Sequence, residues 1–154
     1  AYRNNYAEDL RIDFPRIPFA GNFNDFNRIA ELGGQLVDLH LLNTSGKHFD
    51  RPVSKYFGTG NDKIEMGEYN QEELRIYINS NKYFDNVEPN VWSYHIGGYQ
   101  VLKKYLDDRK KLGDALDPKL FSTILTAISH TLRIQSDLDR IFPSIEKNYI
   151  NKAI

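Results

Sequence analysis

The stretch "EYNQEELRIYINSNKYF", residues 68–84, contains the pattern that decides the fold. Its run "LRIYIN", residues 74–79, alternates apolar side chains with Arg75, Tyr77 and Asn79. A period of two predicts a half-buried strand. One face of this strand should pack on a core, and the other should offer hydrogen-bond donors and an aromatic ring to a partner. The preceding "EYNQEE" predicts the turn into the strand.

The surrounding region, residues 43–88, is rich in Gly, Asn and Asp, and its aromatic and β-branched residues come in short bursts. Such a texture is typical of short antiparallel strands joined by tight turns. We therefore expect a small antiparallel sheet over about residues 53–84. The predicted strands lie near residues 53–57, 63–69, 74–79 and 82–84.

Apolar residues at helical spacing flank this region on both sides and predict helices at about residues 23–42, 98–110 and 118–141. Asn22 or Asn24 can cap the first helix, and Asp117 before Pro118 can cap the third. The pair Gly33-Gly34 predicts close helix packing or a kink. The predicted fold class is α+β, with helices bracketing the sheet.

The chain also shows three regions of different composition. Residues 1–20 contain "FPRIPF", whose prolines favour extended backbone and predict a linker or docking segment. Residues 21–142 should form the domain, and residues 143–154 a C-terminal tail. The opening lacks a methionine and a signal-peptide pattern, so we expect a fragment of a longer protein.

Composition limits the class of protein. The 154 residues carry a formal net charge of -1, which argues against a uniformly cationic nucleic-acid binder but permits a basic face. The absence of cysteine excludes disulfides and thiolate zinc sites. No apolar run is long enough to cross a bilayer. A cytoplasmic protein without a membrane partner is the simplest interpretation.

The sequence gives little support for catalysis by this chain. "YFGTG", residues 56–60, resembles a cofactor loop, but strand-like sequence follows it, so a hairpin turn is favoured. The four histidines lack ligand spacing, which argues against a metal. Asp-x-Lys occurs at residues 108–110 and 117–119 without a preceding Pro-Asp pair, and no Pro-Pro methylation loop or thiol nucleophile is present. We expect no catalytic residue, metal or cofactor in this fragment.

The segment "NVWSYHIGGYQVLKKYLDDRKK", residues 90–111, contains the single tryptophan and two adjacent glycines. Adjacent glycines do not suit a phosphate cradle. We expect Trp92, Tyr94, Ile96 and Tyr99 to pack a corner, with Gly97-Gly98 as a tight entry into the following helix.

Several strings in this order resemble one family: "FPRIPF", "ELGGQLVDLHLL" at residues 31–42, and "RIYINSNKYFDNVEPNVWSYHIGGYQVLKKYLDDRK" at residues 75–110. Over roughly residues 10–140 the chain is similar to the C-terminal target-recognition (specificity) domain of Type ISP restriction-modification enzymes. Tyr105, where the family commonly has tryptophan, and the Asn-rich strands depart from the family pattern.

This resemblance implies a parent enzyme with a nuclease, a helicase-type ATPase and an N6-adenine DNA methyltransferase, which together use ATP, Mg²⁺ and S-adenosylmethionine. The domain itself would read double-stranded DNA beside its own N-terminal methyltransferase domain. Base edges are read by polar side chains on strands or loops. The expected DNA contacts are Lys47, His48, Arg51, Lys55, Tyr56, Asn79, Asn81, Lys82 and Tyr83. We expect Lys47, Arg51 and Lys55 on phosphates, and Asn79, Asn81 and Lys82 nearer bases.

Two other functions stay open at this point. The domain could dock on the methyltransferase through "FPRIPF" and the helix at residues 23–42, without reading DNA. It could also be an enzyme that uses Tyr and His side chains near residues 92–99. Salt-dependent DNA binding that falls on substitution of Arg51, Lys55 or Lys82 would distinguish a DNA reader from both.

Overall fold

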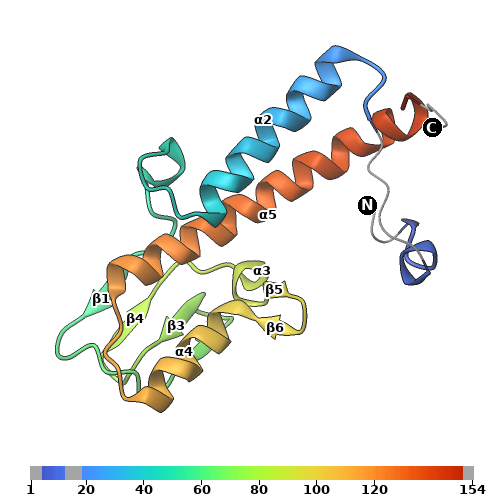
Figure 1. The fold of residues 1–154 in the computed structure, drawn as a ribbon. Helices are drawn as coiled ribbons and strands as arrows, with labels where there is room; N and C mark the ends of the chain where they lie inside the picture. Colours follow the sequence, from blue (N-terminus) through green and yellow to red (C-terminus); the bar gives the residue numbers. More distant parts are fainter. Residues whose placement is uncertain (1–4, 13–18, 151–154) are drawn as a thin grey trace. The chain divides into compact units, whose positions relative to one another are not determined.

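A computed structural model describes residues 5–12 and 19–150 of the chain (Figure 1). The predicted docking segment "FPRIPF" lies outside the described residues except for Phe19. Two compact units divide the chain, one of residues 39–130 and the other of residues 1–38 and 131–154. The long helix α5 contributes residues to both units.

The unit of residues 39–130 is built on a four-stranded antiparallel sheet in the order β1-β4-β3-β2. Its strands are β1 (Tyr56–Gly58), β2 (Glu68–Asn70), β3 (Arg75–Tyr77) and β4 (Lys82–Phe84). A 3-10 turn, η2 (Lys47–Phe49), precedes β1. The predicted α+β class and the antiparallel sheet are confirmed, with strands shorter than expected.

One face of this sheet is the core of the unit. Ile76 is fully buried, as the alternation in β3 predicts, and Phe84 of β4 is fully buried as well. The helix α4 (Val101–Leu112) adds Leu102 and Leu106, and the first turns of α5 (Pro118–Lys147) add Phe121, whose ring lies 5.0 Å from that of Phe84. Burying each of these side chains contributes about 1.5–3 kcal/mol. The core thus fixes which strand residues face outward.

The segment before α4 differs from the expectation. After a short helix, α3 (Pro89–Trp92), a two-stranded hairpin of β5 (His95–Ile96) and β6 (Tyr99–Gln100) occupies the residues predicted to begin the helix at 98. Gly97 and Gly98 form its two-residue turn, and Gly97 has a φ of +59°, which favours glycine. Trp92 and Tyr94 are half-buried, but the packing predicted for Ile96 and Tyr99 is wrong because both are exposed.

Helix α5 begins as predicted and ends later. The carboxylate of Asp117 accepts a 3.0 Å hydrogen bond from the backbone N–H of Leu120, which is the expected cap. The helix continues through Pro143 to Lys147 rather than ending near residue 141. Ile141 and Ile145 are buried, and this packing offsets the hydrogen bond that proline removes from the helix.

The other unit joins the second part of α5 to α2 (Phe23–His40). Ala20, Ile141 and Ile145 form its buried cluster, against which Ile29 and Leu32 pack. The side chain of Asn22 caps α2 by accepting a 2.8 Å hydrogen bond from the N–H of Asp25. A 3-10 turn, η1 (Asp9–Arg11), lies near the N-terminus.

The glycine pair within α2 does not mark close packing. A Cβ atom at Gly33 or Gly34 would meet no described atom within 4 Å. The expectation of a close helix contact there is therefore wrong among the described residues. The helix also ends two residues before the predicted boundary, and Leu42 has a φ of +50°.

Candidate nucleic-acid interface

The outer face of the sheet carries a row of aromatic side chains, which we call the aromatic row: Phe57, Tyr83 and Tyr77. Phe57 of β1 lies opposite Tyr83 of β4, which lies opposite Tyr77 of β3. The ring centroids of Phe57 and Tyr83 are 5.6 Å apart with an interplanar angle of 23°, and those of Tyr83 and Tyr77 are also 5.6 Å apart. Phe57 is 41% exposed. The row is thus an apolar surface that solvent reaches.

Arg75 lies across this row. Its guanidinium carbon is 4.4 Å from the centroid of the Tyr83 ring, within the range of a cation–π interaction. Its Nη1 lies 3.3 Å from a carboxylate oxygen of Glu73, which also accepts a hydrogen bond from the Tyr77 hydroxyl. The Nε of Arg75 is buried without a hydrogen-bond partner among the described atoms. The guanidinium is held in place by the Glu73 carboxylate and the Tyr83 ring.

Three of the predicted contact residues make side-chain contacts within the unit instead: Lys82 and Asn79 are buried, and Tyr56 is half-buried. The Nζ of Lys82 lies 2.6 Å from the Asp62 carboxylate, which also accepts a 2.9 Å hydrogen bond from the Tyr56 hydroxyl. The bond from Lys82 holds the pKa of Asp62 below its usual value, and burial raises the pKa of Tyr56. Only 10% of the Lys82 side chain is exposed. We call Tyr56, Asp62 and Lys82 the buried triad after its lysine; Tyr56 and Asp62 are half-buried.

Asn79 is the third such residue, and its side chain organises the turn between β3 and β4. Its amide nitrogen donates to the carbonyls of Asn61 and Lys63 at 3.3 and 3.1 Å, and its oxygen accepts from the N–H of Asn81 at 3.0 Å. Asn79 and Lys82 were expected to present exposed side chains to a partner, but both are buried. They bring the loop before β2 against the β3–β4 turn.

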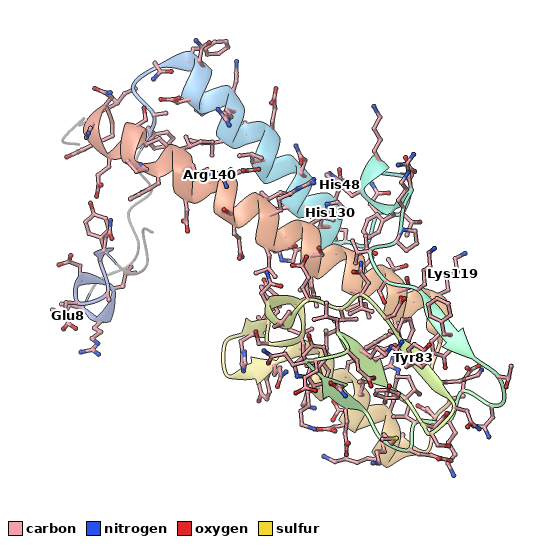
Figure 2. The ribbon with its side chains drawn as sticks, turned by 180° about the vertical axis from the view of Figure 1, so that it is seen from behind. Glu8, His48, Tyr83, Lys119, His130 and Arg140 are labelled. Carbon is pink, nitrogen blue, oxygen red and sulfur yellow. The ribbon has the colours of Figure 1, made fainter. Side chains whose placement is uncertain are left out.

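The other predicted residues lie at the surface. Lys47, Arg51, Lys55 and Asn81 are exposed, and none of these three cations forms a salt bridge with another described residue. The ring of His48 is half-buried and lies 5.1 Å from that of His130 on α5 (Figure 2). Tyr83 is half-exposed in the aromatic row. We call residues 47–55 the basic loop, although it also contains Asp50.

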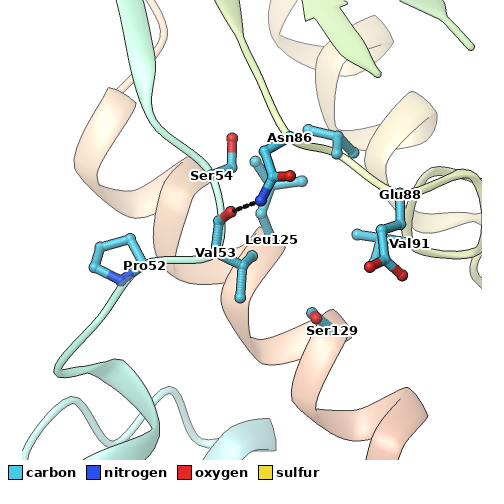
Figure 3. Close-up of a pocket in the computed structure, with 9 residues that line it drawn as sticks. Pro52, Val53, Ser54, Asn86, Glu88, Val91, Leu125 and Ser129 are labelled. Carbon is cyan, nitrogen blue, oxygen red and sulfur yellow. Dashed lines mark hydrogen bonds between the residues drawn. The ribbon is translucent and has the colours of Figure 1, made fainter. Parts of the chain in front are cut away.

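Hydrogen bonds hold the end of the basic loop against the segment after β4. The Asn86 side chain donates to the carbonyl of Val53 at 2.7 Å (Figure 3). The Ser54 hydroxyl donates to the carbonyl of Asp85 at 2.6 Å, and the N–H of Lys55 donates to its carboxylate at 3.1 Å. The position of Lys55 beside the sheet is therefore fixed by backbone contacts, while its side chain stays in solvent.

A pocket of about 320 Å³ lies beneath this loop, lined by residues of the loop, of the segment 86–91 and of α5 (Figure 3). Its lining contains one carboxylate, Glu88, and one hydroxyl on α5, Ser129. No histidine or lysine lines it. In the described part of the chain, no group of three or more His, Cys, Asp or Glu side chains is placed to hold a metal.

Sequence reasoning missed Phe57, Arg75 and Tyr77 as candidate contacts. The alternation had placed Arg75 and Tyr77 on an outward face, and the structure confirms that placement. The missing signal was register: Phe57 joins the row only because β1 pairs with β4. That pairing crosses more than twenty residues of chain, and local patterns do not reveal it.

The fold and surface define the class: a small α+β domain whose sheet presents aromatic and arginine side chains beside a basic loop. The family model of the Type ISP C-terminal specificity domain matches residues 1–134. The chain belongs to this family, which gives it a role in DNA target recognition within a restriction-modification enzyme. Neither the curated proteins nor the solved structures include a significant match. Among the described residues, no helix is long and apolar enough to cross a membrane.

Proposed function

We propose that this domain reads a double-stranded DNA target with the outer face of its sheet. The observation that carries the proposal is the guanidinium of Arg75 laid on the aromatic row, in a chain of the specificity-domain family. Arginine makes bidentate hydrogen bonds to guanine O6 and N7 in the major groove, and β-ribbons and sheets are known to enter DNA grooves. The aromatic row supplies apolar contact to thymine methyl groups and sugars.

Glu73 acts in this proposal as a temporary partner for Arg75. The side chains of Arg75 and Glu73 are 36% and 43% exposed, so their ion pair is weak and open to exchange. A guanine base offers two acceptors, O6 and N7, to the guanidinium. Glu73 offers one carboxylate oxygen, which lies 3.3 Å from Nη1 of Arg75. Binding to a wrong base would leave the guanidinium without that second acceptor, which is a source of discrimination.

The basic loop supplies the contacts that do not depend on sequence. Lys47, Arg51 and Lys55 are exposed cations without a carboxylate partner among the described residues, so they are free to meet phosphates. Asn81 lies in the turn between β3 and β4, and His48 lies in η2 within the basic loop; these two residues complete the proposed contact set. The buried triad and Asn79 support this surface from inside the unit, and their substitution would act on it indirectly.

The parent enzyme that we propose is an N6-adenine DNA methyltransferase that uses S-adenosylmethionine, with an ATP- and Mg²⁺-dependent motor and a nuclease. The domain would bind DNA beside its own methyltransferase domain, which extrudes the target adenine. A cytoplasmic location follows from this role, because the DNA that such enzymes modify is there.

The test is the methylated motif of the full-length protein in a host, mapped by single-molecule sequencing. Arg75→Ala should relax the motif at one guanine and weaken specific binding by about 1–3 kcal/mol. Lys55→Ala should weaken binding to all sequences and lower the salt slope by about one. Arg140→Ala, an exposed arginine paired with Asp137 in the other unit, is the matched control. An unchanged motif in Arg75→Ala would refute the proposed reading surface.

A second candidate function is docking on the methyltransferase domain without DNA reading. It is favoured by an apolar stripe on α2, where Phe23, Phe26 and Val37 are 74%, 48% and 56% exposed and share one side of the helix. If the domain docks through this stripe, Val37→Asp should weaken its association with the methyltransferase domain in the full-length protein. The stability of this chain should be unchanged. If instead Val37→Asp leaves domain assembly intact and Arg75→Ala alters the motif, docking is not the main function.

A further inference from the structure

The β5–β6 hairpin ends in an apolar tip that the fold does not use. Ile96 and Tyr99 lie directly opposite each other beside the turn, and they are 56% and 65% exposed. His95, Gly97 and Gly98 are exposed as well. Large apolar side chains are usually buried, but both of these project into solvent beside the turn of the hairpin.

The base of the hairpin is anchored although its tip is exposed. The Gln100 side chain donates to the carbonyl of Trp92 at 2.8 Å, and the N–H of Val101 donates to that of Tyr94 at 3.0 Å. Trp92 stacks on Tyr69 with ring centroids 5.3 Å apart. An isolated two-stranded hairpin is barely stable in water, so these contacts are what present the tip in one conformation.

The hairpin itself carries no charge that would repel a polyanion. Between Glu88 and Lys103 the chain carries no charged side chain other than the titratable His95, so no carboxylate of the hairpin repels phosphates. The tip is also small. A stable protein interface buries about 800 Å² on each partner, far more than two side chains offer, whereas a base-pair step accepts a single apolar side chain.

We propose that Ile96 and Tyr99 form a wedge that enters the DNA duplex and partly unstacks one base-pair step when the domain binds its target. This inference rests on the proposed DNA-reading function and adds a mechanical role to it. Proteins that insert Ile, Leu or Phe between base steps kink the duplex. The contacts that the bent DNA makes with the protein offset the free-energy cost of unstacking. Unstacking near the target also lowers the cost of extruding a base.

The wedge predicts a preference for duplexes whose stacking is already weakened. If insertion opposes base stacking, a mismatch at the inserted step removes part of that opposition. The full-length wild-type protein should then bind the mismatched duplex roughly ten-fold more tightly than the matched one. A protein without the wedge gains nothing from the mismatch, so the double variant Ile96→Ser/Tyr99→Ser should bind both duplexes equally.

The experiment uses the full-length protein and duplexes that contain its methylated motif. A single mismatch, or a single 2-aminopurine, is moved through the motif and its flanks, and affinity and 2-aminopurine fluorescence are measured at each position. Wild type should give enhanced binding and raised fluorescence at the extruded adenine and also at one further position, and the double variant should lose both signals at that further position. Leu112→Ser, which removes an apolar side chain that is 75% exposed near the end of α4, is the matched control and should behave as wild type.

The outcomes separate the wedge from the function on which it rests. Specific binding by wild type with no raised fluorescence at any position other than the extruded adenine overturns the wedge and leaves DNA reading intact. Retention of both signals at the further position by the double variant also overturns it. Absence of DNA binding by wild type refutes the proposed function and the wedge together. If the substitutions lower the melting temperature of the DNA-free protein, the tip is covered by protein and the wedge is wrong.

Discussion

Replacing Lys82 with methionine separates a structural role of this lysine from a DNA-binding one. Its Nζ lies 2.6 Å from the Asp62 carboxylate, and the two side chains are 10% and 33% exposed. Removing one partner of a fully buried ion pair costs about 3–5 kcal/mol, whereas an exposed pair contributes about 0–1 kcal/mol. For this pair, in which Lys82 is buried and Asp62 half-buried, we expect Lys82→Met to lower the free energy of unfolding by about 2 kcal/mol.

The partner substitution should cost more. Asp62→Asn leaves the ammonium of Lys82 in the interior without a countercharge, so we expect a loss of about 3 kcal/mol. Methionine occupies much of the volume of the lysine stem, and the double variant should therefore be less destabilised than the two single losses added together. The difference, on the order of 1–2 kcal/mol, is the coupling energy of the pair.

Urea unfolding followed by tryptophan fluorescence measures these changes. The single tryptophan, Trp92, stacks on Tyr69 in the same unit as the buried triad, so its emission reports on that unit. In parallel, the salt slope of DNA binding by the full-length protein should be unchanged in Lys82→Met. A stability change below about 0.5 kcal/mol together with a slope reduced by about one would refute the structural role and restore Lys82 as a DNA contact.

Three further predictions concern single positions. Gly58→Ala should lower the free energy of unfolding by more than about 2 kcal/mol in urea, because a Cβ would lie 1.9 Å from the Asn81 carbonyl oxygen at a φ of +107°. Gly34→Ala, where a Cβ would meet no described atom within 4 Å, should raise it by about 0.5–1 kcal/mol. Because the folded-state pKa of Asp62 is lowered, its contribution is present above about pH 4 and lost as pH falls through that pKa. Acid titrations of unfolding should therefore be shallower for Asp62→Asn than for wild type.

The strand pattern could be read from the sequence because it depends on neighbours. The alternation in residues 74–79 placed Ile76 inside and Arg75 outside, and both positions are confirmed. The same parity puts Lys82 on the inner face with Phe84, two residues away. A lysine was nevertheless expected outside, because the carboxylate that makes its burial tolerable comes from Asp62, twenty residues earlier in the chain.

Helix boundaries depended on contacts that sequence alone does not display. The start of α4 was placed too early because Gly97-Gly98 can serve a hairpin turn as readily as a helix entry. The end of α5 was placed too early because a proline at residue 143 usually stops a helix, whereas the burial of Ile141 and Ile145 keeps this one intact.

Under the proposed function, the alternation lets the domain change its target without losing its fold. In β4, Lys82 and Phe84 hold the interior through the buried triad and the contact with Phe121, while Tyr83 between them faces outward beside Arg75. Substitution of an outward residue removes little buried area, so it should change the surface offered to DNA at a cost of about 0.5 kcal/mol or less. Substitution of either inward neighbour alters the sheet itself. Under the proposed function, target specificity and stability therefore depend on alternate residues of the same strand.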